Sequence, residues 1–252
     1  MKGGDNINSK NFTIIMNILK YANGALYQKH LIKIMSKDIN ERQVRRYIRT
    51  LEGLGFLKIA KVDNKYNVLY ITAKAYNEIF NIKKRTANTC SNYILEKNFI
   101  GSYIKYKYQN ILADNLWYQV HEESVTYVQR LKDIELLRKF RDGIIMYNMY
   151  IYEHREIIKD EYVTILNLIV YKHYIQNKDI KNLIIILNKL IERYVDLEYN
   201  IMIDYKIYSL NSINMIFLEK SLENYYSKKE NVSDISNKYK IECIDLRKND
   251  YD

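Results

Sequence analysis

The chain has 252 residues, of which 48% are hydrophobic and 28% charged, so it can form one or two hydrophobic cores and we expect two domains. Its two cysteines, Cys90 and Cys243, lie far apart without metal-ligand spacing, which excludes a disulfide scaffold. No apolar run approaches the roughly 20 residues of a membrane span, and no N-terminal leader is recognisable, so the pattern predicts a cytoplasmic protein with no membrane partner.

The formal net charge of +10 is unevenly distributed along the chain. Residues 1–89 hold 17 Lys and Arg against 6 Asp and Glu, whereas residues 90–252 hold 23 against 24. The abundance of Lys, Asn, Ile and Tyr (26 Tyr) and the absence of proline suggest an AT-rich coding bias. Such a bias would affect both segments alike, so the basic excess of the first segment indicates a polyanionic partner.

The segment from residue 10 to residue 38 predicts two helices and a short turn. Apolar residues recur at helical spacing from Asn11 to Ala22 and stop at the turn signal Asn23-Gly24. A second helix is expected from Leu26 to Met35, followed by the turn of residues 36–38. We expect these elements to form a helix-turn-helix with the next helix.

That next helix carries four arginines on one face. Asn40 is a good N-cap with Gln43 three residues later, so a helix should begin here and end near Gly53. Helical geometry turns three apolar side chains inward and the arginines outward. The inward residues are Val44, Ile48 and Leu51, and the outward ones are Arg42, Arg45, Arg46 and Arg49. A solvated basic face and a DNA recognition helix both fit this pattern.

A hairpin and one more helix are expected after the arginine helix. The strands are predicted at 56–62 and 66–71 around a turn at 63–65, and Thr72 can cap the following helix. The segment 47–79, YIRTLEGLGFLKIAKVDNKYNVLYITAKAYNEI, resembles the recognition helix and wing of bacterial winged-helix regulators of the MarR and PadR type and of plasmid replication-relaxation proteins. The residues that fill the family pattern are Leu51, Glu52, Gly55, Phe56, Leu57, Ile71, Thr72 and Lys74. Ala75 replaces the usual glycine, and the predicted wing contains none.

The rest of the chain is expected to be helical, which makes the predicted fold class mainly α: an N-terminal winged helix-turn-helix followed by an all-α domain. Helices are predicted at 93–112, 124–140, 144–158, 161–175, 179–199 and 203–226, with a heptad stripe between Ile180 and Leu197. Residues 239–246 form either a short strand or a disordered end. The expected organisation is a tail at 1–9, a winged-helix domain at 10–82, a linker at 83–91, a helical domain at 92–228 and a tail at 229–252.

No catalytic or metal-binding pattern is recognisable, so we expect neither an enzyme nor a cofactor. His30, His121, His154 and His173 share no ligand spacing, and His173 continues an apolar stripe, which favours a core position. Trp117 is expected to pack within the C-terminal domain, with ligand stacking as the lesser alternative.

The leading functional hypothesis is a sequence-specific double-stranded DNA-binding protein, a dimeric transcriptional regulator or a factor that binds a plasmid or phage locus. Two further hypotheses are a protein-interaction adaptor that works through its helical domain and a plasmid replication initiator. Dimerisation is expected through the helical domain. The expected DNA-binding residues are Arg42, Gln43, Arg45, Arg46 and Arg49 on the helix, Lys37 before it, and Lys61 and Lys65 on the hairpin.

Overall fold

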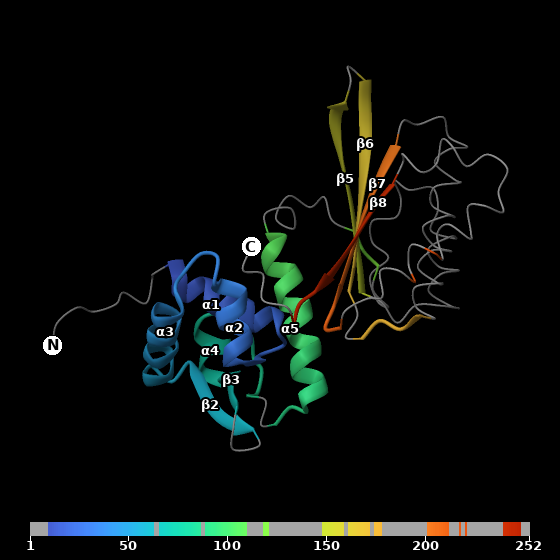
Figure 1. Ribbon diagram of the computed structural model, residues 1–252. Helices are drawn as coiled ribbons and strands as arrows, with labels where there is room; N and C mark the ends of the chain where they lie inside the picture. The colour runs from blue at the N-terminus through green and yellow to red at the C-terminus, as the bar shows by residue number, and fades with distance from the viewer. Residues whose placement is uncertain are drawn as a thin grey trace. The chain divides into compact units, whose positions relative to one another are not determined.

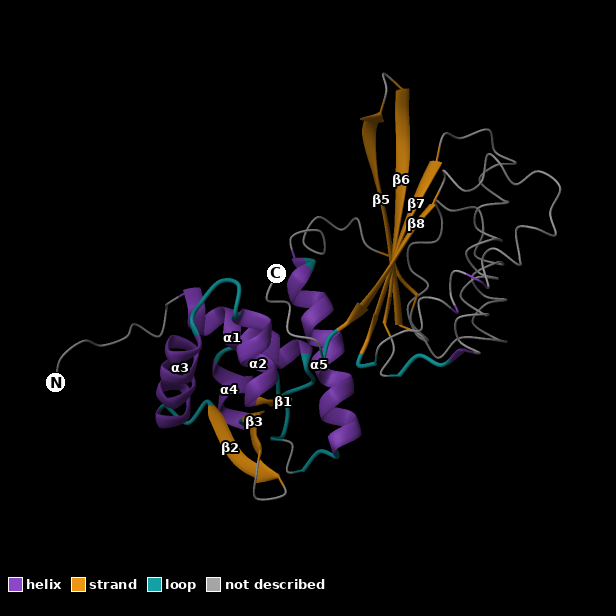
Figure 2. Cartoon of the chain, viewed as in Figure 1, coloured by secondary structure: helices purple, strands orange, loops and turns teal. Residues whose placement is uncertain are grey.

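The computed structural model describes residues 10–62, 66–86, 89–109, 118–120, 148–158, 161–171, 174–177, 201–211, 217, 220 and 239–247. The chain forms two compact units, Met1–Gln109 and Asn110–Asp252. Both contain strands, as Figure 2 shows in orange. The protein is therefore a mixed α and β structure, and the prediction of a mainly α fold is wrong.

The first unit combines helices with short strands (Figure 1). Its elements are α1 (Lys10–Tyr21), β1 (Ala25–Tyr27), α2 (Gln28–Met35), α3 (Glu41–Gly53), β2 (Leu57–Val62), β3 (Tyr66–Ile71), α4 (Ala73–Glu78) and α5 (Asn92–Lys107). The three strands form an antiparallel sheet in the order β1, β3, β2. The predicted helices and hairpin of this region are confirmed, whereas β1, only three residues long, was not expected.

The turn between α1 and β1 requires glycine. The predicted end of the first helix is confirmed, because Asn23 and Gly24 both adopt positive φ angles, 53° and 86°. The Gly24 N–H donates to the Leu19 carbonyl at 2.8 Å, which closes the helix end. A Cβ at position 24 would lie 2.1 Å from the Tyr76 hydroxyl oxygen. This close approach lets α4 pack directly over the turn.

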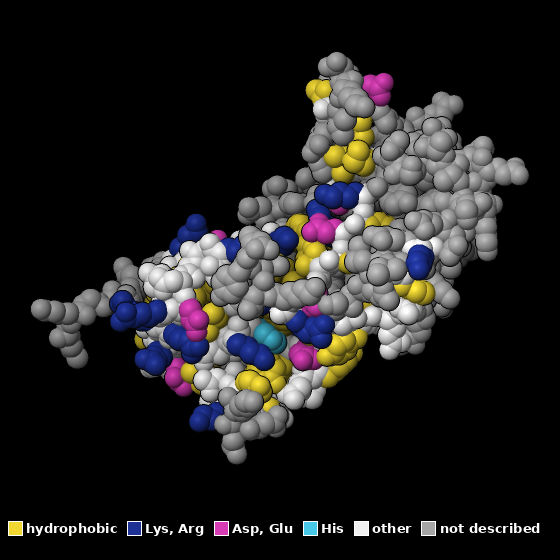
Figure 3. Space-filling view, in the orientation of Figure 1, with side chains coloured by type: hydrophobic (Ala, Val, Ile, Leu, Met, Phe, Trp, Pro, Cys, Tyr) yellow, Lys and Arg dark blue, Asp and Glu magenta, His cyan; other side chains and the backbone are white. Residues whose placement is uncertain are grey.

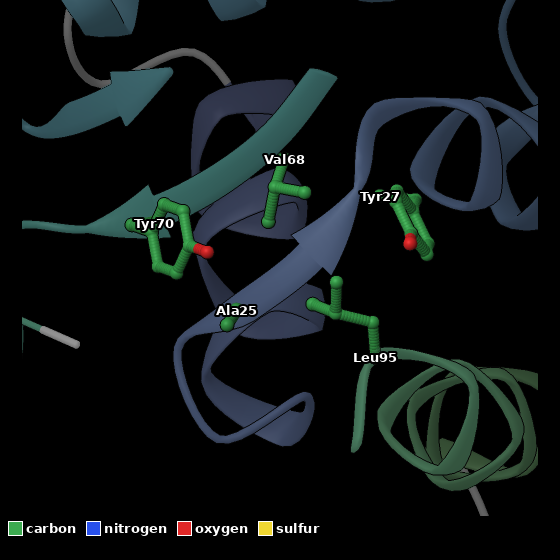
Figure 4. Packing of buried hydrophobic residues seen from close by; sticks show 5 residues of the cluster. All are labelled: Ala25, Tyr27, Val68, Tyr70 and Leu95. Carbon is green, nitrogen blue, oxygen red and sulfur yellow. The ribbon is translucent and has the colours of Figure 1, made fainter. Parts of the chain in front are cut away.

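Helix α5 is part of the first unit. Figure 4 shows Leu95 of α5 near a cluster of apolar side chains from β1 and β3, which consists of Ala25, Tyr27, Val68 and Tyr70. The Asn98 side-chain amide, itself buried, donates to the Ala25 carbonyl at 2.9 Å. The sequence placed a domain boundary at residues 83–91, whereas the first unit extends through α5 to Gln109.

The second unit is built on a five-stranded mixed sheet in the order β4, β5, β6, β7, β8. The strands are β4 (Tyr118–Val120), β5 (Asn148–Ile158), β6 (Glu161–Tyr171), β7 (Ile201–Ser209) and β8 (Tyr239–Asp245). Strands β4, β5 and β6 pair antiparallel, while β7 runs parallel to β6 and β8 runs parallel to β7.

These strands overturn the expected all-α domain. Strands β5 and β6 occupy the helices predicted at 144–158 and 161–175, and the C-terminal part of β7 occupies residues 203–209 of the helix predicted at 203–226. The buried residues described on β6 are Val163, Ile165, Asn167, Ile169 and Tyr171. Most of them are β-branched or aromatic, which are the side-chain types that strands favour. Of the two alternatives for residues 239–246, the structure shows the strand. The helices predicted at 124–140 and 179–199, Trp117, His121 and His173 lie outside the described residues.

Candidate nucleic-acid interface

The N-terminus of α3 is capped as the sequence predicts. The Asn40 side-chain oxygen accepts a hydrogen bond from the Gln43 backbone N–H at 2.9 Å, which satisfies one of the unpaired donors of the first turn. The predicted inward residues Val44, Ile48 and Leu51 are all buried. Burial of this stripe fixes which face of α3 is turned outward.

Contacts from α1 hold α3 in place. The Asn11 side-chain amide donates to the Tyr47 hydroxyl at 3.0 Å. The rings of Phe12 and Tyr47 meet edge to face, with 5.3 Å between their centroids. Helix α3 is therefore anchored both by its buried stripe and by a flanking aromatic side chain, which limits its rotation about its own axis.

The outward face of α3 carries every residue that the sequence predicted for it. Arg42, Gln43, Arg45, Arg46 and Arg49 are all exposed. Figure 3 shows dark-blue side chains gathered over the part of the first unit where α3 lies. At a rise of about 1.5 Å per residue, Arg42 and Arg49 are about 10 Å apart along the axis, a length that a DNA major groove accommodates.

Arg45 has an acidic partner on the same helix. Its Nε atom donates to Glu41 Oε1 at 2.8 Å. Both side chains are half exposed, at 49% for Arg45 and 57% for Glu41, so the pair contributes little stability and can open when a stronger anion approaches. Glu41 is not among the predicted site residues, although its spacing of four residues from Arg45 indicates the pair.

Side chains at the start of α4 bond to the backbone at the C-terminus of α3. The Lys74 ammonium donates to the carbonyl of Leu54, the C-cap residue, at 2.9 Å. The Thr72 hydroxyl donates to the Gly55 carbonyl at 2.7 Å and accepts from the Ala75 N–H at 3.2 Å. Thr72 and Lys74 therefore fasten the end of the arginine helix to the start of α4.

The structure describes two of the three predicted lysines around α3. Lys37, in the turn before α3, and Lys61, on β2, are exposed. Lys61 pairs in register with Asn67, whose side-chain amide donates to Gln28 Oε1 at 3.0 Å, so the hairpin is braced against α2. Lys65 lies outside the described residues.

The turn before α3 is also tied to α5. The Tyr106 hydroxyl donates to Asp38 Oδ2 at 2.5 Å, and burial together with this carboxylate raises the pKa of Tyr106. Sequence reasoning missed this contact, because 68 residues separate the two positions and no local pattern connects them. The bond connects the approach to α3 with the last helix of the unit.

His30 is the one titratable group of the first unit whose pKa is strongly lowered among the described residues. Its ring stacks on Phe99 with 4.1 Å between centroids, and its Nδ1 atom is buried without a hydrogen-bond partner. Burial, reinforced by Lys29 and Lys33, lowers its pKa to about 3. The ring therefore stays neutral at physiological pH and acts as an aromatic packing group between α2 and α5.

The described residues contain no cluster of three or more His, Cys, Asp or Glu side chains placed to hold a metal ion. Within the same part of the chain, no helix combines the length and apolar character needed to cross a membrane. Comparison of the chain with protein-family models, with curated proteins and with solved structures found no match.

Proposed function

We propose that the first unit binds double-stranded DNA by placing α3 in the major groove. The single observation that carries this proposal is the division of α3 into a buried aliphatic stripe and an exposed face with four arginines. A capped and anchored helix with guanidinium groups on its outer face can reach guanine edges and phosphates together.

The arrangement of elements supports the proposal. Helix, strand, helix, helix and hairpin follow one another in the first unit, and the third strand lies between the first two in the sheet. This is the order of a winged helix, in which the helix before the hairpin enters the major groove and the hairpin lies beside it. The resemblance of residues 47–79 to winged-helix regulators points to the same two elements.

The distribution of charge between the units supports it further. Residues 1–109 hold 20 Lys and Arg against 7 Asp and Glu, whereas residues 110–252 hold 20 against 23. With the boundary that the structure gives, the basic excess of the first unit is +13. Like charges on one compact unit repel one another, and a polyanion removes that repulsion on binding.

Position along α3 suggests a division of labour among the candidate residues. Arg42, Gln43 and Arg46 lie on its N-terminal half, the part of such a helix that reaches the base edges. Arginine pairs with guanine and glutamine with adenine, each through two hydrogen bonds. Arg45, Arg49, Lys37 and Lys61 would contact phosphates. The biological outcome we propose is transcriptional regulation or occupation of a plasmid or phage locus.

The test is selection of bound genomic fragments with the purified full-length chain, followed by fluorescence anisotropy on the selected duplex. Replacing Arg42 and Arg46 with alanine should weaken binding about a hundredfold, at about 1 to 3 kcal/mol for each lost base contact. The matched control replaces Lys20 and Lys97 with alanine, which removes two exposed charges from α1 and α5. This control should weaken binding by no more than a few fold.

Equal losses of DNA affinity in the two variants would show that α3 is only one part of a diffuse basic surface. Failure of the unaltered chain to select any duplex would contradict the proposal altogether. In that case a protein partner for the same face, as in an adaptor, becomes the better explanation.

A further inference from the structure

Strand β8 ends the sheet of the second unit in the part of the chain that the structure describes. It pairs with β7 on one side, and no described strand pairs with its other side. A strand in this position presents a row of backbone donors and acceptors that another strand can pair with. The charges on β8 and β7 indicate which strand that is.

The two strands carry alternating charges in register. Asp204 of β7 lies opposite Lys240 of β8, and Lys206 lies opposite Glu242. Residues two apart on a strand share a face, so these four side chains form a square with unlike charges at neighbouring corners. The Lys206 ammonium contacts Asp204 Oδ2 at 2.8 Å, which closes one edge of the square.

We propose that β8 pairs antiparallel with β8 of a second copy of this chain, centred on Ile241. This register places Lys240 opposite the partner's Glu242 and Glu242 opposite the partner's Lys240. The alternation of the square then continues across the two-fold axis: negative, positive, negative, positive in one row and the reverse in the next. Two five-stranded sheets become one continuous sheet.

The same charges disfavour the competing arrangements. A parallel pairing in register places Lys240 opposite the partner's Lys240, and like charges directly opposite one another destabilise a sheet. A register shift of one residue turns the charged side chains toward the opposite face of the partner. The half-buried Ile241 lies on the axis, where it faces its own copy and is covered by it. This interface is independent of the proposed DNA binding.

A charge-reversal experiment tests the interface. Light scattering with size exclusion on the full-length chain should show a dimer at micromolar concentration. In Lys240→Glu, positions 240 and 242 are both negative, and in Glu242→Lys they are both positive. Like charges then face one another across the axis, so the affinity of self-association should fall by at least about tenfold in each variant. Mixing the two variants should restore a dimer, because unlike charges then face one another.

Recovery in the mixture distinguishes a broken interface from a misfolded chain. A monomeric parent chain would overturn the proposal. So would variants that dimerise as well as the parent, or weakened variants whose mixture stays monomeric.

A disulfide provides the second test. Residues directly opposite each other in an antiparallel pair have Cα atoms about 4.5 to 5.5 Å apart, within the range that a disulfide spans. Ile241→Cys should therefore give a covalent dimer on mild oxidation, seen on a non-reducing gel. Ile244→Cys is the control, because the two copies of position 244 would be six residues, about 20 Å, apart along the strands. Equal crosslinking of both variants, or of the parent through Cys243, would overturn the proposed register.

Discussion

Two charged surfaces of this protein follow opposite rules. The outer face of α3 concentrates one sign, with four exposed arginines within two turns. The face of β7 and β8 alternates signs between neighbouring positions, with Asp204 and Glu242 on one diagonal and Lys206 and Lys240 on the other. The first surface repels a copy of itself, whereas the second is complementary to a copy of itself.

The difference indicates a different partner for each surface. A single-sign surface gains most from a polyanion, which releases counterions on binding. An alternating surface gains nothing from a polyanion but can continue its own pattern across a two-fold axis. If both proposals hold, the chain recognises nucleic acid and a second copy of itself through separate surfaces, and substitutions should remove either function without the other.

Salt should separate the two surfaces most clearly. If the four residues assigned to phosphates, Arg45, Arg49, Lys37 and Lys61, each neutralise one, the slope of log affinity against log salt is about −3.6, so DNA affinity should fall about a hundredfold between 50 and 200 mM salt. Self-association, which depends mainly on backbone pairing, should change by no more than a few fold. Anisotropy and sedimentation over the same salt series measure both. An equal dependence of DNA affinity and self-association on salt would show that the two surfaces do not differ in this way.

The free energy of unfolding of the first unit should fall in acid because of His30. Its pKa is about 6.5 in the unfolded chain and lowered to about 3 in the fold, so the unfolded state binds the proton more readily. Its contribution to stability is complete above pH 6.5 and is lost as the pH falls toward 3. The slope is up to about 1.4 kcal/mol per pH unit.

Urea unfolding at pH 6.5 and pH 5 measures this effect. The variant His30→Leu should show a shallower loss than the parent over that interval, since the leucine cannot take up a proton. Identical losses in the two proteins would show that His30 is not held neutral by its packing against Phe99.

The bond between Tyr106 and Asp38 should contribute less. Tyr106→Phe removes the hydroxyl that donates to Asp38 Oδ2 and should lower the free energy of unfolding by about 1 kcal/mol. A double-mutant cycle with Asp38→Ala isolates the pair, and the double variant should lose less than the sum of the single losses. Additive losses of unfolding free energy would mean that the two side chains act separately. The bond would then not stabilise the contact between α5 and the turn before α3.

Removal of the Glu41 carboxylate should have the smallest effect, and it should raise the affinity for DNA. Glu41→Gln removes the only acidic side chain in the first turn of α3 and the ion-pair partner of Arg45. DNA affinity should rise by about threefold, in line with the modest energy of an exposed pair at this spacing. A decrease would show that Glu41 positions Arg45 for binding instead of competing with the phosphates.

The sequence predicted the structure correctly where the spacing of apolar residues fitted only one type of secondary structure. On α3, Asn40 and the stripe of Val44, Ile48 and Leu51 fit a helix, and arginines are poor candidates for burial, so the face and its residues were predicted correctly. In β6, apolar residues occupy nearly every position, so both helical and strand periods fit the same letters. The β-branched and aromatic content was the signal that favoured a strand.

Other features depend on contacts that no local pattern encodes. The strand β1 is three residues long and exists because it pairs with β3. Assignment of α5 to the first unit rests on the packing of Leu95, Asn98 and Phe99. The charge square on β7 and β8 appears only once the register is known, since more than thirty residues separate Asp204 from Lys240.

The most direct test of the central claim is chemical protection of guanine N7, an atom that lies in the major groove. Dimethyl sulfate footprinting on the selected duplex should show protected guanines with the parent chain. Arg42→Ala should expose a subset of them at a concentration that still saturates the duplex. A tight complex that leaves every guanine N7 reactive would contradict the placement of α3 in the major groove.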